Sequence, residues 1–164
     1  MKIYKLVVIT VCMVLVMSGC IPGPGKPDLV VTTLEATGLG FVGSYGGVKI
    51  PIRVVVKNQG DVEAGIFKVS TEYMGPQGGP FAVGFEVPGQ TLVWYPFTSS
   101  PLAPGGEVTF EGYAHFYPGL SDMTVSLWAI ADSCGGDEFM PDYCRVDESD
   151  ESNNESTVIS VYLP

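Results

Sequence analysis

The stretch Val48-Lys49-Ile50-Pro51-Ile52-Arg53-Val54-Val55-Val56-Lys57 decides the fold of this 164-residue chain. One of its faces takes an apolar residue at every second position, namely Val48, Ile50, Ile52, Val54 and Val56. The basic residues Lys49, Arg53 and Lys57 share the other face. A period of two is typical of a β-strand with one face in a core and the other in water. Pro51 has no N–H to donate, so we expect its nitrogen to face a bulge or a position without a neighbour.

The rest of the chain repeats this pattern in short segments between turns rich in glycine and proline, of which it holds 21 and 13. No window has a convincing 3.6-residue period, so we expect no helix. We predict an all-β protein, an antiparallel β-sandwich of seven to nine strands in one domain over residues 28–164. The remaining strands are predicted in six segments: 28–35, 66–74, 81–87, 107–117, 123–131 and 156–163.

The first residues are typical of an export signal. Leu6–Met17 is an apolar run of twelve residues after Lys2 and Lys5, whereas a membrane-spanning helix needs about 20. Met17-Ser18-Gly19-Cys20 resembles the lipobox of prokaryotic lipoproteins, although Met17 stands where Leu is commonest. The resemblance implies that residues 1–19 are removed as a signal peptide and that Cys20 carries the lipid. A plain signal peptide and a short membrane helix remain alternatives.

The expected location is the cell envelope, with the membrane side left open. Residues 20–27 are predicted to be a lipid-anchored linker, because the spacing of proline and glycine in Pro22-Gly23-Pro24-Gly25-Lys26-Pro27 suits no regular element. The chain has a net charge of −10, and removal of Lys2 and Lys5 leaves six basic against 18 acidic residues, or −12. Such a surface repels phosphate backbones, which argues against nucleic acid as a partner. It also favours cations, including Ca²⁺.

Three segments together resemble the CARDB domain, a cell-adhesion-related module of prokaryotic surface proteins. They are Pro27-Asp28-Leu29-Val30-Val31, then Val54-Val55-Val56-Lys57-Asn58-Gln59-Gly60-Asp61, and finally Val146-Asp147-Glu148-Ser149-Asp150-Glu151-Ser152-Asn153-Asn154. The resemblance implies an immunoglobulin-like sandwich that is not an enzyme and that binds or spaces at the cell surface. This chain is longer than a module of about 100 residues, with extra sequence at 75–104 and an insert at 133–145 that separates Asp132 from the acidic tail.

Cys134 and Cys144 lie in the insert and are the thiols that remain once Cys20 carries lipid. In an exported protein we expect them to form a disulfide that stiffens the insert. A metal site is the alternative, but no His lies nearby and the spacing is not that of a zinc site.

Nine carboxylates and one basic residue, Arg145, lie between Asp132 and Glu155. Because Ca²⁺ prefers carboxylate, hydroxyl and amide oxygens, a calcium site is a candidate here. Its first ligands would be Asp132, Asp137, Asp147, Asp150 and Glu151. The alternative is structural: Asp, Ser and Asn side chains stabilise a turn by accepting backbone hydrogen bonds, a role that suits Asn153 and Asn154.

Aromatic residues offer a second candidate site. Trp94, Tyr113 and Tyr117 could stack on sugars if they are exposed; the alternative is that the long insert covers them. His115 is the single imidazole, and no nucleophile-elbow sequence accompanies it, so we do not expect an enzyme. Asn154-Glu155-Ser156 is a glycosylation sequon, which matters only in a host that glycosylates surface proteins.

These observations predict a lipid-anchored, non-catalytic module for binding, adhesion or assembly at the cell surface, with a surface protein or a polysaccharide as its partner. A carbohydrate-binding module that uses the exposed aromatic residues is the alternative.

Overall fold

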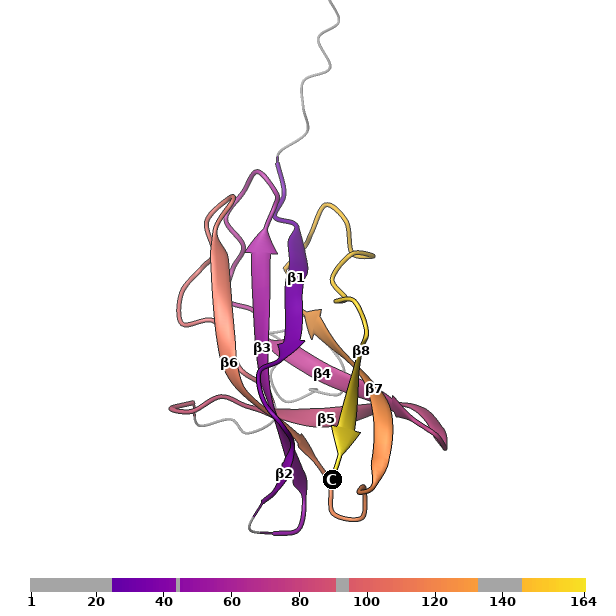
Figure 1. The fold of residues 1–164 in the computed structure, drawn as a ribbon. Coiled ribbons are helices and arrows are strands. Elements are labelled where there is room, and N and C mark those ends of the chain that lie inside the picture. The colour runs from indigo at the N-terminus through magenta and orange to yellow at the C-terminus, as the bar shows by residue number, and fades with distance from the viewer. Residues whose placement is uncertain (1–24, 44, 91–94, 133–145) are drawn as a thin grey trace, which may run out of the picture.

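The structure is a computed structural model that describes residues 25–43, 45–90, 95–132 and 146–164. The all-β prediction is confirmed, because these ranges contain eight strands and no helix (Figure 1). The strands are β1 (Leu29–Ala36), β2 (Phe41–Val42), β3 (Val48–Asn58), β4 (Val69–Gly75), β5 (Gly78–Glu86), β6 (Glu107–Phe116), β7 (Met123–Ala131) and β8 (Ile159–Leu163).

Every strand pair is antiparallel, and the strands follow one path in the order β1-β3-β6-β5-β4-β7-β8, with β2 paired to β3 beyond the end of β1. Strand β5 joins the two layers of the sandwich: its residues 78–83 pair with β4, and its residues 84–86 pair with β6. The predicted antiparallel sandwich is therefore confirmed, with β5 making it continuous on one side.

Strand β3 behaves as its alternation predicts. Residues at every second position, from Val48 to Val56, are almost fully buried. Pro51 pairs with Tyr113 of β6 on one side. On the other side its carbonyl accepts a hydrogen bond from the Thr37 N–H, in the gap between the end of β1 and the start of β2. The proline nitrogen faces the same gap, so the ladder loses no bond there.

Three predicted strand starts differ from the observed ones by three residues. Strand β4 begins at Val69 rather than at Ile66. The Gly75–Pro80 stretch, expected to be a loop, is mostly strand, because β5 begins at Gly78 and only residues 76–77 turn the hairpin. Strand β8 starts at Ile159 rather than at Ser156. At Ser156 the side-chain hydroxyl accepts a hydrogen bond from the Ala129 N–H, and this bond replaces a backbone bond of regular pairing there.

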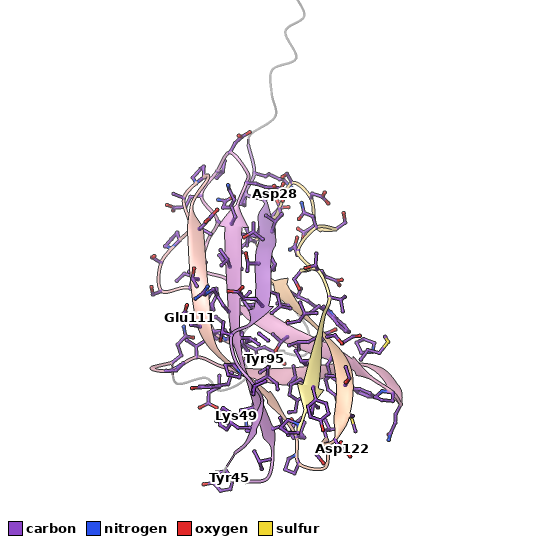
Figure 2. All side chains as sticks on the ribbon, viewed as in Figure 1. Asp28, Tyr45, Lys49, Tyr95, Glu111 and Asp122 are labelled. Atoms are coloured by element: carbon purple, nitrogen blue, oxygen red, sulfur yellow. The ribbon has the colours of Figure 1, made fainter. Side chains whose placement is uncertain are left out.

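The sandwich has two distinct ends (Figures 1 and 2). Lys26 to Leu29, where the chain enters β1, lie at one end, and Asp28 marks that end in Figure 2. Pro164 and the β2–β3 hairpin with Tyr45 lie at the opposite end. The core runs in sequence from Leu29 to Leu163, so a chain that starts at Ile21 keeps all of it.

Candidate functional site

The strand-entry end, formed by Lys26–Leu29, the Asn58–Asp61 turn and the acidic segment Val146–Asn154, brings together all three segments of the predicted family resemblance. The Asp28 carboxylate accepts hydrogen bonds from Asn153 Nδ2 (2.9 Å) and Gln59 Nε2 (3.1 Å). Lys26 Nζ lies 2.6 Å from an Asp147 carboxylate oxygen. The acidic segment and the turn therefore both hold the start of β1.

Asn58 is the centre of the turn. Its side chain is fully buried and makes four hydrogen bonds. Oδ1 accepts from the N–H groups of Asp28 (3.1 Å) and Gly60 (3.0 Å), and Nδ2 donates to the carbonyls of Val62 (2.7 Å) and Leu102 (2.9 Å). Gly60 is required beside it, because a Cβ there would lie 2.3 Å from the Lys26 carbonyl oxygen.

Glu148 is a buried acid, with 4% of its surface exposed. The Leu29 N–H and Asn154 Nδ2 donate to its two carboxylate oxygens, the latter at 2.8 Å. The pKa of Glu148 is raised to about 7, chiefly by burial and to a lesser extent by the nearby Asp132 and Glu151 charges, against the lowering effect of the two hydrogen bonds. This carboxyl group therefore titrates near neutral pH.

Four of the five predicted calcium ligands lie in the described residues, and each takes part in a local contact. Asp132 accepts from the Val146 N–H (2.6 Å), and Glu151 accepts from the Glu148 N–H (3.1 Å). Asp150 accepts from the Ser152 N–H and hydroxyl, bonds that lower its pKa. Asp147 instead pairs with the side chain of Lys26. The contacts of Asp132, Asp150 and Glu151 are of the kind that the turn-stabilising alternative predicts, and that of Asp147 is not.

The described residues contain no group of three or more His, Cys, Asp or Glu side chains placed to share a metal ion. Asp137, Cys134 and Cys144 lie outside the described residues, so the disulfide and a calcium site that includes the insert stay predictions.

The three residues of the predicted aromatic site have different outcomes. Trp94 lies outside the described residues. Tyr113 is half-buried: the Phe41 ring packs edge-on against it with centroids 5.7 Å apart, and Lys49 Nζ lies 5.7 Å from its ring centroid. Tyr117, past the end of β6, is 54% exposed. His115 pairs with Lys49 and Gly84 across the sheet and packs under Gly47.

The opposite end carries a group of exposed apolar side chains, of which only Tyr117 was a predicted site residue. We call it the apolar end, and its members are Leu39, Phe41, Val42, Tyr45, Tyr117 and Tyr162. Leu39 is 93% exposed and Tyr45 is 91% exposed. Soluble proteins seldom gather such side chains without a binding role. A sequence signal exists in hindsight: residues 36–48 contain no charged residue.

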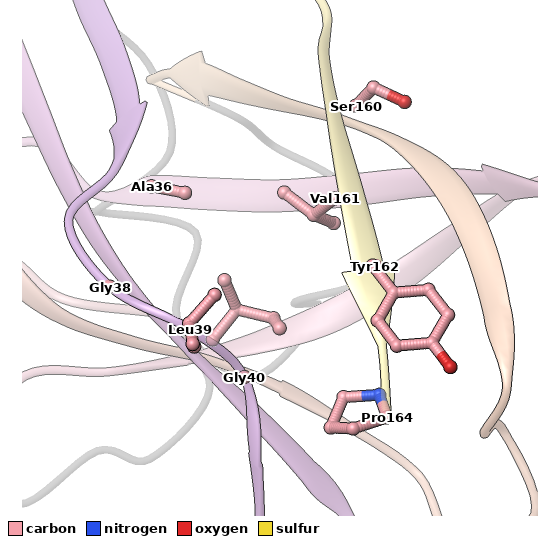
Figure 3. A pocket seen from close by; sticks show the side chains of 9 residues that line it. Ala36, Gly38, Leu39, Gly40, Ser160, Val161, Tyr162 and Pro164 are labelled. Atoms are coloured by element: carbon pink, nitrogen blue, oxygen red, sulfur yellow. The ribbon is translucent and has the colours of Figure 1, made fainter.

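A cavity of about 360 Å³ opens at the apolar end, between the segment that follows β1 and strand β8 (Figure 3). Leu39 and Gly40 form one wall, Val161, Tyr162 and Pro164 form the other, and Ile50 of the core also lines it. The cavity lies where the two terminal strands of the sheet path, β1 and β8, do not pair with each other. The two walls approach each other closely at Gly40, because a Cβ on Gly40 would touch Pro164.

Comparison with known proteins supports the fold. No protein-family model matches the chain, and no curated protein sequence matches it. Among solved structures, it is similar to the CARDB domain of the PF1109 protein from Pyrococcus furiosus, determined in complex with di-metal ions. The likeness covers 85% of this chain and 90% of that one, with 18% identity and a TM-score of 0.50. The predicted CARDB resemblance is thus confirmed at the level of fold.

No helix in the described ranges has the length and apolar character needed to cross a membrane.

Proposed function

We propose that this chain, which has the fold of a CARDB domain, is a lipid-anchored binding or adhesion module of the cell surface and has no catalytic activity. The lipobox-like Met17-Ser18-Gly19-Cys20 supports the anchor. Two or three acyl chains, each contributing ~0.8 kcal/mol per buried CH₂, hold a protein stably on a membrane.

The observation that carries the proposal is the separation of the two ends (Figure 2). The chain enters the sandwich at Lys26–Leu29, and the exposed apolar side chains lie at the opposite end. The linker of residues 20–27 reaches at most about 28 Å when extended. A lipid on Cys20 therefore keeps the strand-entry end near the membrane and turns the apolar end outward, toward partners.

Labelling with an alkyne analogue of palmitate tests the anchor. The full chain, expressed in a bacterial host, should incorporate the label and sediment with membranes. The Cys20→Ala variant should lose both properties, whereas Cys12→Ala should remain labelled if its signal peptide is processed. Equal labelling of the Cys20→Ala variant would contradict the proposal.

The surroundings of His115 support a non-catalytic role. A Ser–His–acid relay needs a carboxylate to orient the imidazole and a hydroxyl beside it. His115 instead lies between a lysine and two glycines, Gly47 and Gly84.

Calcium binding is a further part of the proposal. The domain from Pyrococcus furiosus was determined with two metal ions, which makes a titration of this chain worthwhile. In the described residues Asp132, Asp150 and Glu151 accept backbone hydrogen bonds, and no three acidic side chains are placed to share an ion.

Saccharide binding is a second candidate function. A shallow cleft of about 250 Å³ on the outer face of the sheet is lined by Tyr113, Arg53 and Glu111, among others. A tyrosine ring next to an arginine–carboxylate pair (Arg53 Nε to Glu111, 2.9 Å) offers both stacking and hydrogen bonds to a sugar. A glycan array with the wild type and Tyr113→Ala tests it, with Phe81→Ala as the control, because Phe81 is an exposed aromatic residue of β5 outside this cleft.

A further inference from the structure

Charge is unevenly distributed over this acidic protein. The segments 36–48, 117–121 and 156–164, which build the apolar end, contain no charged residue. Of the nearest charged residues, Lys49 pairs with Glu86, whereas Asp122 accepts a hydrogen bond from the neutral Tyr162 hydroxyl at 2.9 Å. The strand-entry end, by contrast, carries Asp28, Asp61 and the four carboxylates of the acidic segment.

This distribution determines how two copies can approach. With a net charge of −10, two copies repel each other over most of their surface, and the repulsion falls off within about 8–10 Å at physiological salt. Contact between two apolar ends keeps the acidic clusters at the far ends of both molecules. Electrostatic repulsion between the two copies is therefore weakest in this orientation.

The apolar end also has the shape that a symmetric pair needs. A two-fold interface uses the same patch on both copies, so the patch needs both projecting side chains and a cavity that can accept them. Leu39 and Tyr45 project from the loop and hairpin around β2, and the cavity walled by Val161 and Pro164 lies beside Leu39 (Figure 3). An apolar side chain of a second copy would reach Ile50 of the core through this opening.

We propose that the apolar end binds the apolar end of a second copy of this chain, with Leu39 and Tyr45 as its central contacts. The pairing itself does not depend on the lipid-anchored orientation of the proposed function, but one consequence of the pairing does. Because that end faces away from the membrane, the pair would join copies held on two apposed membranes.

The chain from Ile21, which keeps the complete core, tests the pairing in solution by sedimentation equilibrium. We expect a reversible monomer–dimer equilibrium. Leu39→Asp and Tyr45→Asp should each weaken it at least about tenfold, because each places a carboxylate in a desolvated apolar contact. Both side chains are almost fully exposed in the single copy, so neither change should lower the unfolding midpoint.

Met74→Asp is the matched control, since Met74 is also exposed and apolar but lies on β4, outside the apolar end. It should dimerise like the wild type. A chain that stays monomeric up to about millimolar concentration, or a dimer that Leu39→Asp and Met74→Asp weaken equally, would overturn the pairing.

Vesicles that carry the lipidated full chain separate this inference from the proposed function. Clustering of vesicles by the wild type but not by Leu39→Asp supports contact across membranes. A solution dimer without vesicle clustering would refute the adhesive role and leave the pairing intact. Clustering without a solution dimer would refute the pairing.

Discussion

The buried carboxyl group of Glu148 makes a sharp prediction about stability. In an unfolded chain a glutamate has a pKa near 4.5, whereas in the folded protein burial raises the pKa of Glu148 to about 7. The folded state therefore holds this proton more tightly. The stability that protonation contributes is fully present below pH 4.5 and is lost as the pH rises through 7.

The magnitude follows from the shift. A difference of about 2.5 units at 1.36 kcal/mol per unit gives at most about 3 kcal/mol between pH 4.5 and pH 8. Glu148→Gln removes this titration and keeps an acceptor for the Leu29 N–H. Its new amide replaces the oxygen that accepts from Asn154 Nδ2, so the Asn154 amide must turn to present Oδ1, which has no hydrogen bond in the described part of the chain. The protonated carboxyl group of the wild type makes the same demand.

Urea unfolding of wild type and Glu148→Gln at intervals from pH 4.5 to pH 8 measures the effect. The variant should match the wild type at the acid end and exceed its free energy of unfolding by 2 to 3 kcal/mol, roughly, at pH 8. Glu148→Ala is the control. It removes the titration and also leaves the Leu29 and Asn154 donors without an acceptor, so it should be about 1–3 kcal/mol per donor less stable than the wild type at pH 4.5, with the deficit shrinking as the pH rises through 7. Parallel pH profiles for wild type and Glu148→Gln would refute the reasoning.

Four further predictions concern the turn, a close approach, the insert and calcium. Asn58→Ala should cost about 3 kcal/mol or more in urea unfolding, because it leaves the Asp28 and Gly60 N–H groups and the Val62 carbonyl without this partner, while the Leu102 carbonyl keeps the Ala64 N–H; Gln59→Ala, which loses one exposed bond, should cost far less. Gly60→Ala should cost about 1–3 kcal/mol, since its Cβ meets the Lys26 carbonyl; Gly65→Ala, with open space around it, is the control and should be near neutral. Thiol titration of the denatured, unreduced chain from Ile21 should find no free thiol, and reduction should lower stability by about 2–3 kcal/mol; two reactive thiols would exclude the disulfide. A melting temperature that millimolar Ca²⁺ leaves unchanged would exclude the calcium site, whereas a rise would support it.

Much of the fold was predictable because its signals are local. A period of two requires only that neighbouring side chains point to opposite faces, so the sequence of β3 was enough to predict its buried face. The same holds for β7, whose observed bounds, Met123–Ala131, match the predicted segment. The β4–β5 hairpin was harder, because Gly75–Pro80 has turn composition while its backbone continues the pairing.

The candidate sites were less predictable because their members are far apart in the sequence. The acidic segment was singled out, but its chemistry depends on where β1 begins: Glu148 is buried because the Leu29 N–H, 119 positions earlier, needs an acceptor. The apolar end was not foreseen. Leu39, Tyr117 and Tyr162 come from three distant segments and meet because β2 pairs with β3 and β8 ends beside Gly40.

The sequence by itself determined the all-β class, the buried face of β3, the acidic character and the expectation of a lipid anchor, since each of these depends on composition or on neighbours along the chain. Only the tertiary structure decided which carboxylate is buried and which apolar residues stay in water. Both depend on long-range strand pairing, which determines how far each side chain is removed from solvent.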